Sequence, residues 1–233
     1  MMNSAGRTAA TPTSTTMRPS STSCAVIVVP SPPGMVLPLL GLAGALFLLG
    51  RPLWLKGGGL AGLVLTFWLW AGAERPTLLI SGDGTLVGLM TEAGRALSKE
   101  KGGGFIAKNW LEDDGDASDQ IAAAARRAFT GKKGDLTGLM AGRTVRVFAG
   151  KGGAARAAGS CADGALVILS EDWAGAAGDC LLFDRKALAA SGSVAVYGGG
   201  GDLRLVEAKV LAGDRLWNRR PAAQRRSVAA DAP

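Results

Sequence analysis

The sequence predicts a membrane protein with two transmembrane helices in a hairpin, followed by a small mixed α/β domain. Two uncharged apolar runs, residues 34–50 and 57–73, contain 17 residues each, which is at the lower limit for a helix that spans the hydrocarbon core. The loop between them is too short to cross the bilayer again, so the two runs must form a hairpin. Further along the chain, short apolar segments alternate with helix-compatible ones, which is typical of a mixed α/β domain.

The charges around the hairpin predict its orientation. Its loop carries two ionisable residues, Arg51 and Lys56, and both are basic. Because Lys and Arg are enriched in cytoplasmic loops, we expect this loop in the cytoplasm. Residues 74–214 would then form a periplasmic domain, attached to the inner (plasma) membrane of a bacterium, with the lipid bilayer as a partner.

Aromatic residues near one end of the second run support a membrane location. Phe67, Trp68 and Trp70 are of the type that gathers at the membrane surface. The alternative is a buried hairpin in a soluble protein, because both runs are short and rich in glycine and Pro38 interrupts the first.

The composition divides the remaining chain into three parts. Residues 1–33 are rich in Ser, Thr, Pro and Ala, so they are expected to be disordered or a mis-annotated start. The domain at residues 74–214 has 17 Lys and Arg against 18 Asp and Glu, so the net charge of +7 arises outside it. Residues 215–233 form a basic tail that is expected to be disordered.

Within the domain, apolar runs bounded by turn residues predict strands. The first two, at residues 77–80 and 85–90, flank Ser81-Gly82-Asp83-Gly84, which suits a tight reversal. A polar stretch at 93–104 leads to residues 105–111, a third strand or a short helix. A helix is expected at 120–129, capped by Asp119. The later elements are strands at 144–148, 165–169, 180–183, 193–197 and 203–210, with a short helix at 154–158.

The chain contains no histidine. This absence excludes a Ser-His-Asp triad, a Cys-His pair and a histidine-based zinc site, and we therefore predict neither an enzyme nor a bound metal or cofactor. Cys161 and Cys180 are 19 positions apart in a domain expected in an oxidising compartment, where a disulfide can persist. The alternative is two unpaired, buried cysteines.

Two short motifs resemble ligand-binding loops, but each lacks a residue that such a loop requires. Gly150-Lys151-Gly152-Gly153 follows an apolar strand, but the Ser or Thr that holds magnesium in a Walker loop is missing. The acidic cluster that contains Asp114-Gly115-Asp116 lacks the glutamate that ends a calcium loop. A solvated acidic turn is the preferred interpretation of that cluster.

The basic segment from Arg126 to Arg156 is the candidate surface for nucleic acid. It could follow a phosphate backbone, although Phe129 and Phe148 are its only aromatic residues for stacking on bases. The alternative is a solvated face balanced by the neighbouring acids. The segment holds one acid, Asp135, and eight bases: Arg126, Arg127, Lys132, Lys133, Arg143, Arg146, Lys151 and Arg156.

The order of these features resembles the C-terminal region of ComEC-type proteins of the alphaproteobacterial kind without a metallo-β-lactamase domain. The resemblance covers roughly residues 32–221. It begins with the hairpin, Arg75-Pro76 and the TLLISGDGTLVGLM segment. Its other motifs are Trp110-Leu111-Glu112-Asp113-Asp114-Gly115-Asp116, Cys161, Ala165–Ser170, Cys180-Leu181-Leu182-Phe183-Asp184-Arg185 with Leu188, and Arg215.

The resemblance implies a role in competence, as an accessory part or fragment of the channel that takes up single-stranded DNA in natural transformation. Two helices cannot enclose a DNA pore, so the partners implied are other membrane subunits or the missing N-terminal channel domain. From the residues alone, the alternative is a membrane-tethered periplasmic interaction domain with no role in nucleic-acid binding.

Overall fold

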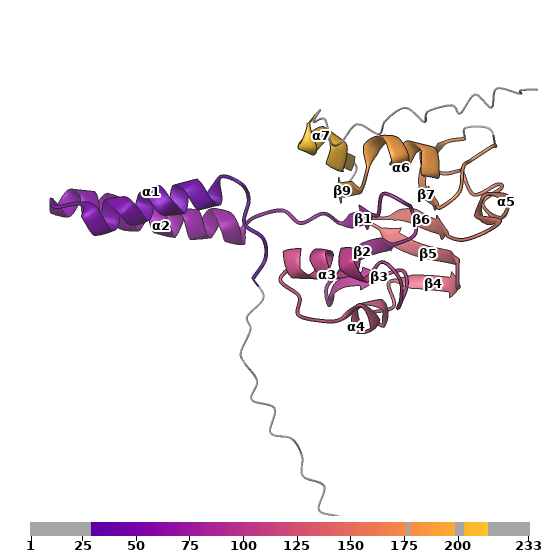
Figure 1. The fold of residues 1–233 in the computed structure, drawn as a ribbon, viewed down its shortest axis with the longest axis horizontal. Helices are drawn as coiled ribbons and strands as arrows, with labels where there is room; N and C mark the ends of the chain where they lie inside the picture. The colour runs from indigo at the N-terminus through magenta and orange to yellow at the C-terminus, as the bar shows by residue number, and fades with distance from the viewer. Residues whose placement is uncertain (1–28, 176–177, 199–202, 214–233) are drawn as a thin grey trace, which may run out of the picture.

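The computed structural model describes residues 29–175, 178–198 and 203–213. It shows a pair of antiparallel apolar helices, α1 (Val36–Leu49) and α2 (Leu53–Ala71), beside a mixed α/β domain (Figure 1). The expectations for residues 1–28 and for the basic tail from residue 214 onward lie outside the described residues.

Small residues form the contact between the two helices. A Cβ added at Gly59 would lie 2.5 Å from the backbone nitrogen of Phe47, and one at Gly62 would lie 3.0 Å from the Cβ of Ala43. Thr66 is buried in the same contact and its hydroxyl donates to the carbonyl of Gly62 (2.7 Å). The large apolar side chains of the hairpin mostly point outward. The helices therefore approach closely through glycine and alanine, as helices in membranes often do.

Among the described helices, only α2 is long and apolar enough to cross a membrane by length and composition. With 14 residues, α1 is shorter than the about 20 residues of a usual span. Pro38 does not interrupt α1, contrary to expectation. It lies in the first turn, where a backbone N–H has no partner within the helix, so proline is tolerated there.

The first sheet is antiparallel throughout, with the strand order β10-β9-β1-β2-β3. Because β9 returns from late in the sequence to pair with β1, the domain cannot be divided into an early and a late half. Its strands are β1 (Leu78–Ile80), β2 (Val87–Thr91), β3 (Gly94–Leu97), β9 (Val194–Gly198) and β10 (Leu203–Glu207).

The second sheet is mixed, with the order β4-β5-β6-β7-β8. The first three strands are antiparallel neighbours, whereas β6, β7 and β8 run parallel. Parallel strands need a crossover, and Figure 1 shows α5 on the connection that leads to β7. The strands are β4 (Phe129–Lys132), β5 (Asp135–Met140), β6 (Arg143–Phe148), β7 (Ala165–Leu169) and β8 (Cys180–Phe183).

The main core lies between the two sheets. Ile80 and Val87 of the first sheet pack in one cluster with Val145 and Ile168 of the second. A second cluster joins β3 to α3 and α4, and a third covers the other face of β6 and β7. The described helices of the domain are α3 (Gly104–Asp113), α4 (Gln120–Ala124), α5 (Gly153–Arg156), α6 (Arg185–Ser191) and α7 (Ala208–Ala212).

The structure corrects several of the predicted elements. The helix expected at 120–129 ends at Ala124, and Phe129 already belongs to β4. Residues 105–111 lie in α3, which selects the helix from the two predicted alternatives. By contrast, β3 occupies part of the stretch expected to be a polar turn, and the segment at 203–210 changes from strand to helix at Ala208. The β4–β5 hairpin was not predicted, because its sequence FTGKKGDLTGLM has no long apolar run.

Candidate nucleic-acid interface

Four of the eight predicted DNA-facing residues gather at one end of the second sheet. Lys132 ends β4 and Lys133 follows it in the β4–β5 turn. The Arg156 guanidinium donates to the carbonyls of Gly134 in that turn (3.2 Å) and of Lys151 (3.1 Å). These bonds hold the loop before α5 against the hairpin turn. We call Lys132, Lys133, Lys151 and Arg156 the basic turn.

The other residues of the set lie elsewhere. The β5–β6 register places Arg143 opposite Met140, a whole strand length away from the basic turn, and its guanidinium approaches the carbonyl of Gly164 (3.5 Å). Arg146 lies in the middle of β6 and donates to the hydroxyl of Ser160 (3.1 Å). The continuous basic segment predicted from sequence is thus split along the sheet.

Arg126 is not part of an exposed basic surface, contrary to expectation. Its side chain is only 14% exposed and forms an ion pair with Asp116 (2.5 Å between Nη1 and Oδ2). The same guanidinium donates to the carbonyl of Arg95 (2.8 Å) and the hydroxyl of Ser118 (2.9 Å). These bonds hold the segment after α4 against β3.

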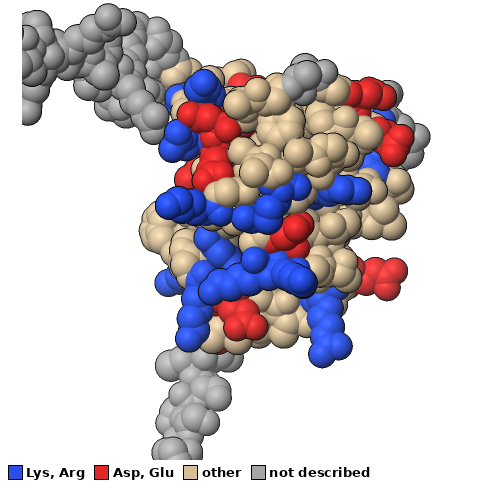
Figure 2. Space-filling view, turned by 90° about the vertical axis from the view of Figure 1, so that its right-hand side faces the viewer, with Lys and Arg blue, Asp and Glu red and all other residues tan. Residues whose placement is uncertain are grey.

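Lysines dominate the accessible charge. Lys132, Lys133, Lys151 and Arg127 are exposed, and none of them has an ion-pair partner among the described residues. Figure 2 shows bands of Lys and Arg on the face of the domain turned away from α1 and α2, with acidic side chains between them. In the β4–β5 register, Asp135 lies opposite Lys132. The face can attract a polyanion while the domain as a whole stays neutral.

The glycine loop before α5 is occupied by a side chain of the protein itself. The amides of Gly152 and Ala154 donate to the two carboxylate oxygens of Glu171 (2.9 and 3.1 Å), and these hydrogen bonds from Ala154 and Gly152 lower the pKa of Glu171. The amide of Gly150 donates to the hydroxyl of Ser170 (2.8 Å). Amides that would hold a phosphate in a nucleotide-binding loop are therefore already satisfied.

The sequence predicted that the acidic motif Asp114-Gly115-Asp116, which follows α3, is a solvated turn. In the structure it is instead a structural anchor. Arg95 is fully buried in β3, and its Nε and Nη2 atoms bind both carboxylate oxygens of Asp114. Its Nη2 also donates to the carbonyl of Pro76 (3.1 Å). In the last turns of α3, Trp110 is half-buried and Leu111 is buried against α4. This arrangement fixes the end of α3 to the first sheet.

Two residues of this motif contact other segments of the chain. Asp116 forms the ion pair with Arg126, and Gly115 lies against Pro30 before α1. Burial raises the pKa of Asp116, but the Arg126 guanidinium and hydrogen bonds from Ser118 outweigh it and lower the pKa to about 2. Gly115 has a positive φ, and a Cβ there would lie 2.6 Å from the ring of Pro30. Only glycine therefore lets the segment before α1 pass this close to the domain.

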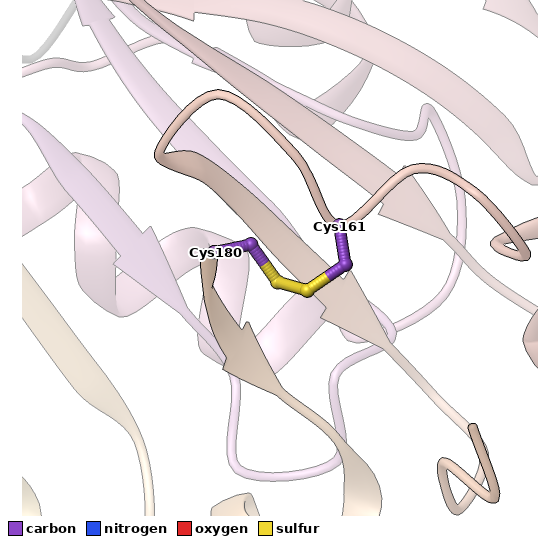
Figure 3. The surroundings of a disulfide bond; sticks show 2 residues. All are labelled: Cys161 and Cys180. Carbon is purple, nitrogen blue, oxygen red and sulfur yellow. A yellow bond between two sulfur atoms is a disulfide. The ribbon is translucent and has the colours of Figure 1, made fainter. Parts of the chain in front are cut away.

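A disulfide joins Cys161 to Cys180 (Figure 3). Cys161 lies before β7 and Cys180 begins β8, so the bond fastens the edge strand of the second sheet. Nearby, Asp184 caps α6 by accepting the amide of Ala187 (2.8 Å).

Arg185 follows this cap and forms a two-point ion pair with Asp172 at 2.7 and 3.0 Å. The pair is on the surface and lies outside the basic turn. Among the described residues, no group of three His, Cys, Asp or Glu could hold a metal ion.

Sequence reasoning missed three of the residues that organise these sites, namely Arg95, Glu171 and Asp172. A lone arginine inside an otherwise apolar strand is the one signal that could have revealed the Arg95–Asp114 pair, since buried charges require partners. Comparisons of this chain with models of protein families, with curated protein sequences and with solved structures found no match. The resemblance to ComEC-type proteins therefore stays a prediction that rests on the residues themselves.

Proposed function

We propose that α1 and α2 anchor this chain in a bacterial inner membrane, with the α/β domain in the periplasm. The support is the exposure of the apolar surface of the hairpin, since only 11% of the apolar window in α2 is buried within the protein. A core helix of a soluble protein would bury most of such a surface. The basic connection that contains Arg51 and Lys56 then belongs on the cytoplasmic side.

The short length of α1 is compatible with this anchor. Its 14 residues rise by roughly 20 Å at about 1.5 Å per residue, less than the about 30 Å of a hydrocarbon core. A short hairpin is accommodated by local thinning of the bilayer at modest cost. Leu49 ends α1 and Leu53 begins α2, and both are among the most exposed side chains, so the apolar surface reaches the connection.

For the domain, we propose that the basic turn binds the phosphates of single-stranded DNA. The single observation that carries this proposal is a set of exposed lysines without ion-pair partners among the described residues, on the face turned away from the hairpin. In a membrane-anchored protein that face points away from the bilayer, toward incoming DNA. The proposed role is accessory to DNA uptake, together with other membrane subunits or a channel domain, as the resemblance to ComEC-type proteins implies.

The test is the salt dependence of binding. The full chain in detergent is titrated with a fluorescent oligothymidylate, and the Lys132→Gln/Lys133→Gln/Lys151→Gln variant is compared with the unchanged chain. Each phosphate contact contributes about 0.7 to the slope of log K against log salt for single strands. The loss of three contacts should therefore lower the slope by about 2.

The control variant is Lys99→Gln/Lys101→Gln/Lys108→Gln, which removes the same charge from the region of β3 and α3. This variant should keep the affinity and the slope of the unchanged chain. Equal affinities and slopes for all three proteins would contradict DNA binding at the basic turn. That result would favour the alternative, a membrane-tethered interaction domain without a nucleic-acid role.

A further inference from the structure

A cleft of about 820 Å³ lies between the hairpin and the domain. Phe67 and Trp70 from the end of α2 line one wall, and Tyr197 and Leu211 of the domain line another. The segment before α1 lines a third side of the cleft, and the indole of Trp70 donates to the carbonyl of Pro30 in it (3.1 Å). Most of the lining is apolar, and the cleft is open to the surroundings.

The cleft continues the apolar surface of the hairpin. Figure 1 shows α7 on the side of the domain that faces the hairpin, and its Val210 and Leu211 are 74% and 76% exposed. At the end of α2, Phe67 and Trp68 are 54% and 71% exposed. A ligand in this place would contact exposed apolar groups from both the hairpin and the domain.

Two charges in the cleft lack an opposite charge. The Arg75 guanidinium is exposed and has no ion-pair partner among the described residues. The Asp113 carboxylate accepts the hydroxyl of Ser31 (2.7 Å) but pairs with no described cation. The other charged groups that line the cleft are balanced, since Asp114 binds Arg95 and Glu74 binds Arg204 (3.3 Å).

We infer that this cleft binds a zwitterionic phospholipid whose headgroup carries a primary ammonium group, such as phosphatidylethanolamine. The Arg75 guanidinium pairs with the phosphate, Asp113 accepts from the ammonium, and the acyl chains lie along Phe67, Trp70 and Leu211. A purely anionic lipid would leave Asp113 unbalanced, and a choline headgroup has no N–H to donate. The inference rests on the membrane anchoring proposed above.

The test is lipid retention by the full chain. Protein purified in a mild detergent is mixed with phosphatidylethanolamine, phosphatidylglycerol or phosphatidylcholine, and the lipid bound to it is measured by native mass spectrometry. Phosphatidylethanolamine should be retained best, and Arg75→Gln and Asp113→Asn should each lower its retention about tenfold, as expected for the loss of one charge-assisted hydrogen bond. Asparagine still accepts the Ser31 hydroxyl, so the fold around Asp113 is preserved.

The control Lys101→Gln, an exposed charge that does not line the cleft, should retain the lipid as the unchanged chain does. Equal retention of the three lipids, or unchanged retention in both cleft variants, overturns the inference. Extraction of cell membranes with alkaline carbonate separates this failure from failure of the anchor. A chain that stays in the membrane but shows no headgroup preference refutes only the lipid site, whereas a chain released by carbonate refutes the anchor and the lipid site with it.

Discussion

The helical hairpin and the α/β domain bury opposite kinds of residue. In the hairpin, the contact between α1 and α2 is made by Gly59, Gly62 and Ala43, while large apolar side chains point outward. In the domain, the large apolar side chains fill the space between two sheets, and one face carries Lys and Arg side chains with acids between them (Figure 2). This difference is what the proposed anchor requires, with the hairpin facing lipid and the domain facing water. Each can be perturbed separately, and the effects should stay within the region that is changed.

The largest effect is expected from Asp114→Asn, in the domain. The change removes the carboxylate that balances Arg95, whose side chain is fully buried. Loss of one partner of a buried ion pair costs about 3–5 kcal/mol, and urea unfolding of the detergent-solubilised chain should show this loss. Glu112→Gln removes the exposed partner of Lys108 and should change the stability by less than about 0.5 kcal/mol. Equal effects of the two changes would contradict the buried-pair interpretation.

The disulfide variant is expected to have the next largest effect. Replacing Cys161 and Cys180 with serine opens a loop closed across 19 positions, which corresponds to about 3 kcal/mol in the chain-entropy estimate. The double variant and the reduced protein should show the same lowered midpoint in urea. A midpoint that does not change on reduction would contradict the role of the bond in holding β8.

A pH-dependent effect is expected from Asp116. Its pKa is lowered to about 2 from the ordinary 3.8, so its charged form stabilises the fold above about pH 4, and this contribution is lost as the pH falls toward about 2. The contribution is at most about 2 kcal/mol. In the Asp116→Asn variant, the free energy of unfolding should depend less on pH between about pH 4 and about pH 2 than it does in the unchanged chain. An unchanged profile would show that Arg126 does not hold the charged form.

The smallest effect on the domain is expected from a change in the hairpin. In the Gly59→Leu variant, the new side chain would meet the backbone of Phe47 and separate the two helices. The free energy of unfolding of the domain should nevertheless change by less than about 0.5 kcal/mol, because position 59 makes no contact with the domain. Spin labels at Leu42 and Leu65 should report a broader distance distribution in Gly59→Leu. In Gly57→Leu, where a Cβ meets nothing within 4 Å, the distribution should stay narrow.

Periodicity and turn chemistry predicted those parts of the fold that depend on local sequence. The apolar runs at β1, β6, β7, β8 and β9 and the Asp119 cap, whose side chain accepts the amide of Ala122 (2.7 Å), were found where expected. The β4–β5 hairpin was missed because threonine, glycine and lysine interrupt the apolar residues of its strands, FTGK and DLTGLM. These strands are held by pairing with each other and with β6. Such pairing is a tertiary effect that local propensity does not contain.

The sequence shows that the candidate segment is basic, but it does not show where the basic side chains lie after folding. The segment from Arg126 to Arg156 contains eight basic residues, but Arg126 is used in an ion pair and Arg146 donates to Ser160. A run of charges along a sequence does not say which of them find partners after folding. Lys132, Lys133 and Lys151 remain exposed after folding, as do Arg127 and Arg156.

The membrane orientation is the central claim, and cysteine labelling in spheroplasts tests it most directly. With Cys24 replaced by serine, one added cysteine replaces Pro52 in the hairpin connection or Lys101 on the exposed surface of the domain. A maleimide that cannot cross membranes should label the Lys101→Cys chain at once and the Pro52→Cys chain only after lysis. Labelling of the Pro52→Cys chain in intact spheroplasts, with protection of the Lys101→Cys chain, would contradict a periplasmic domain.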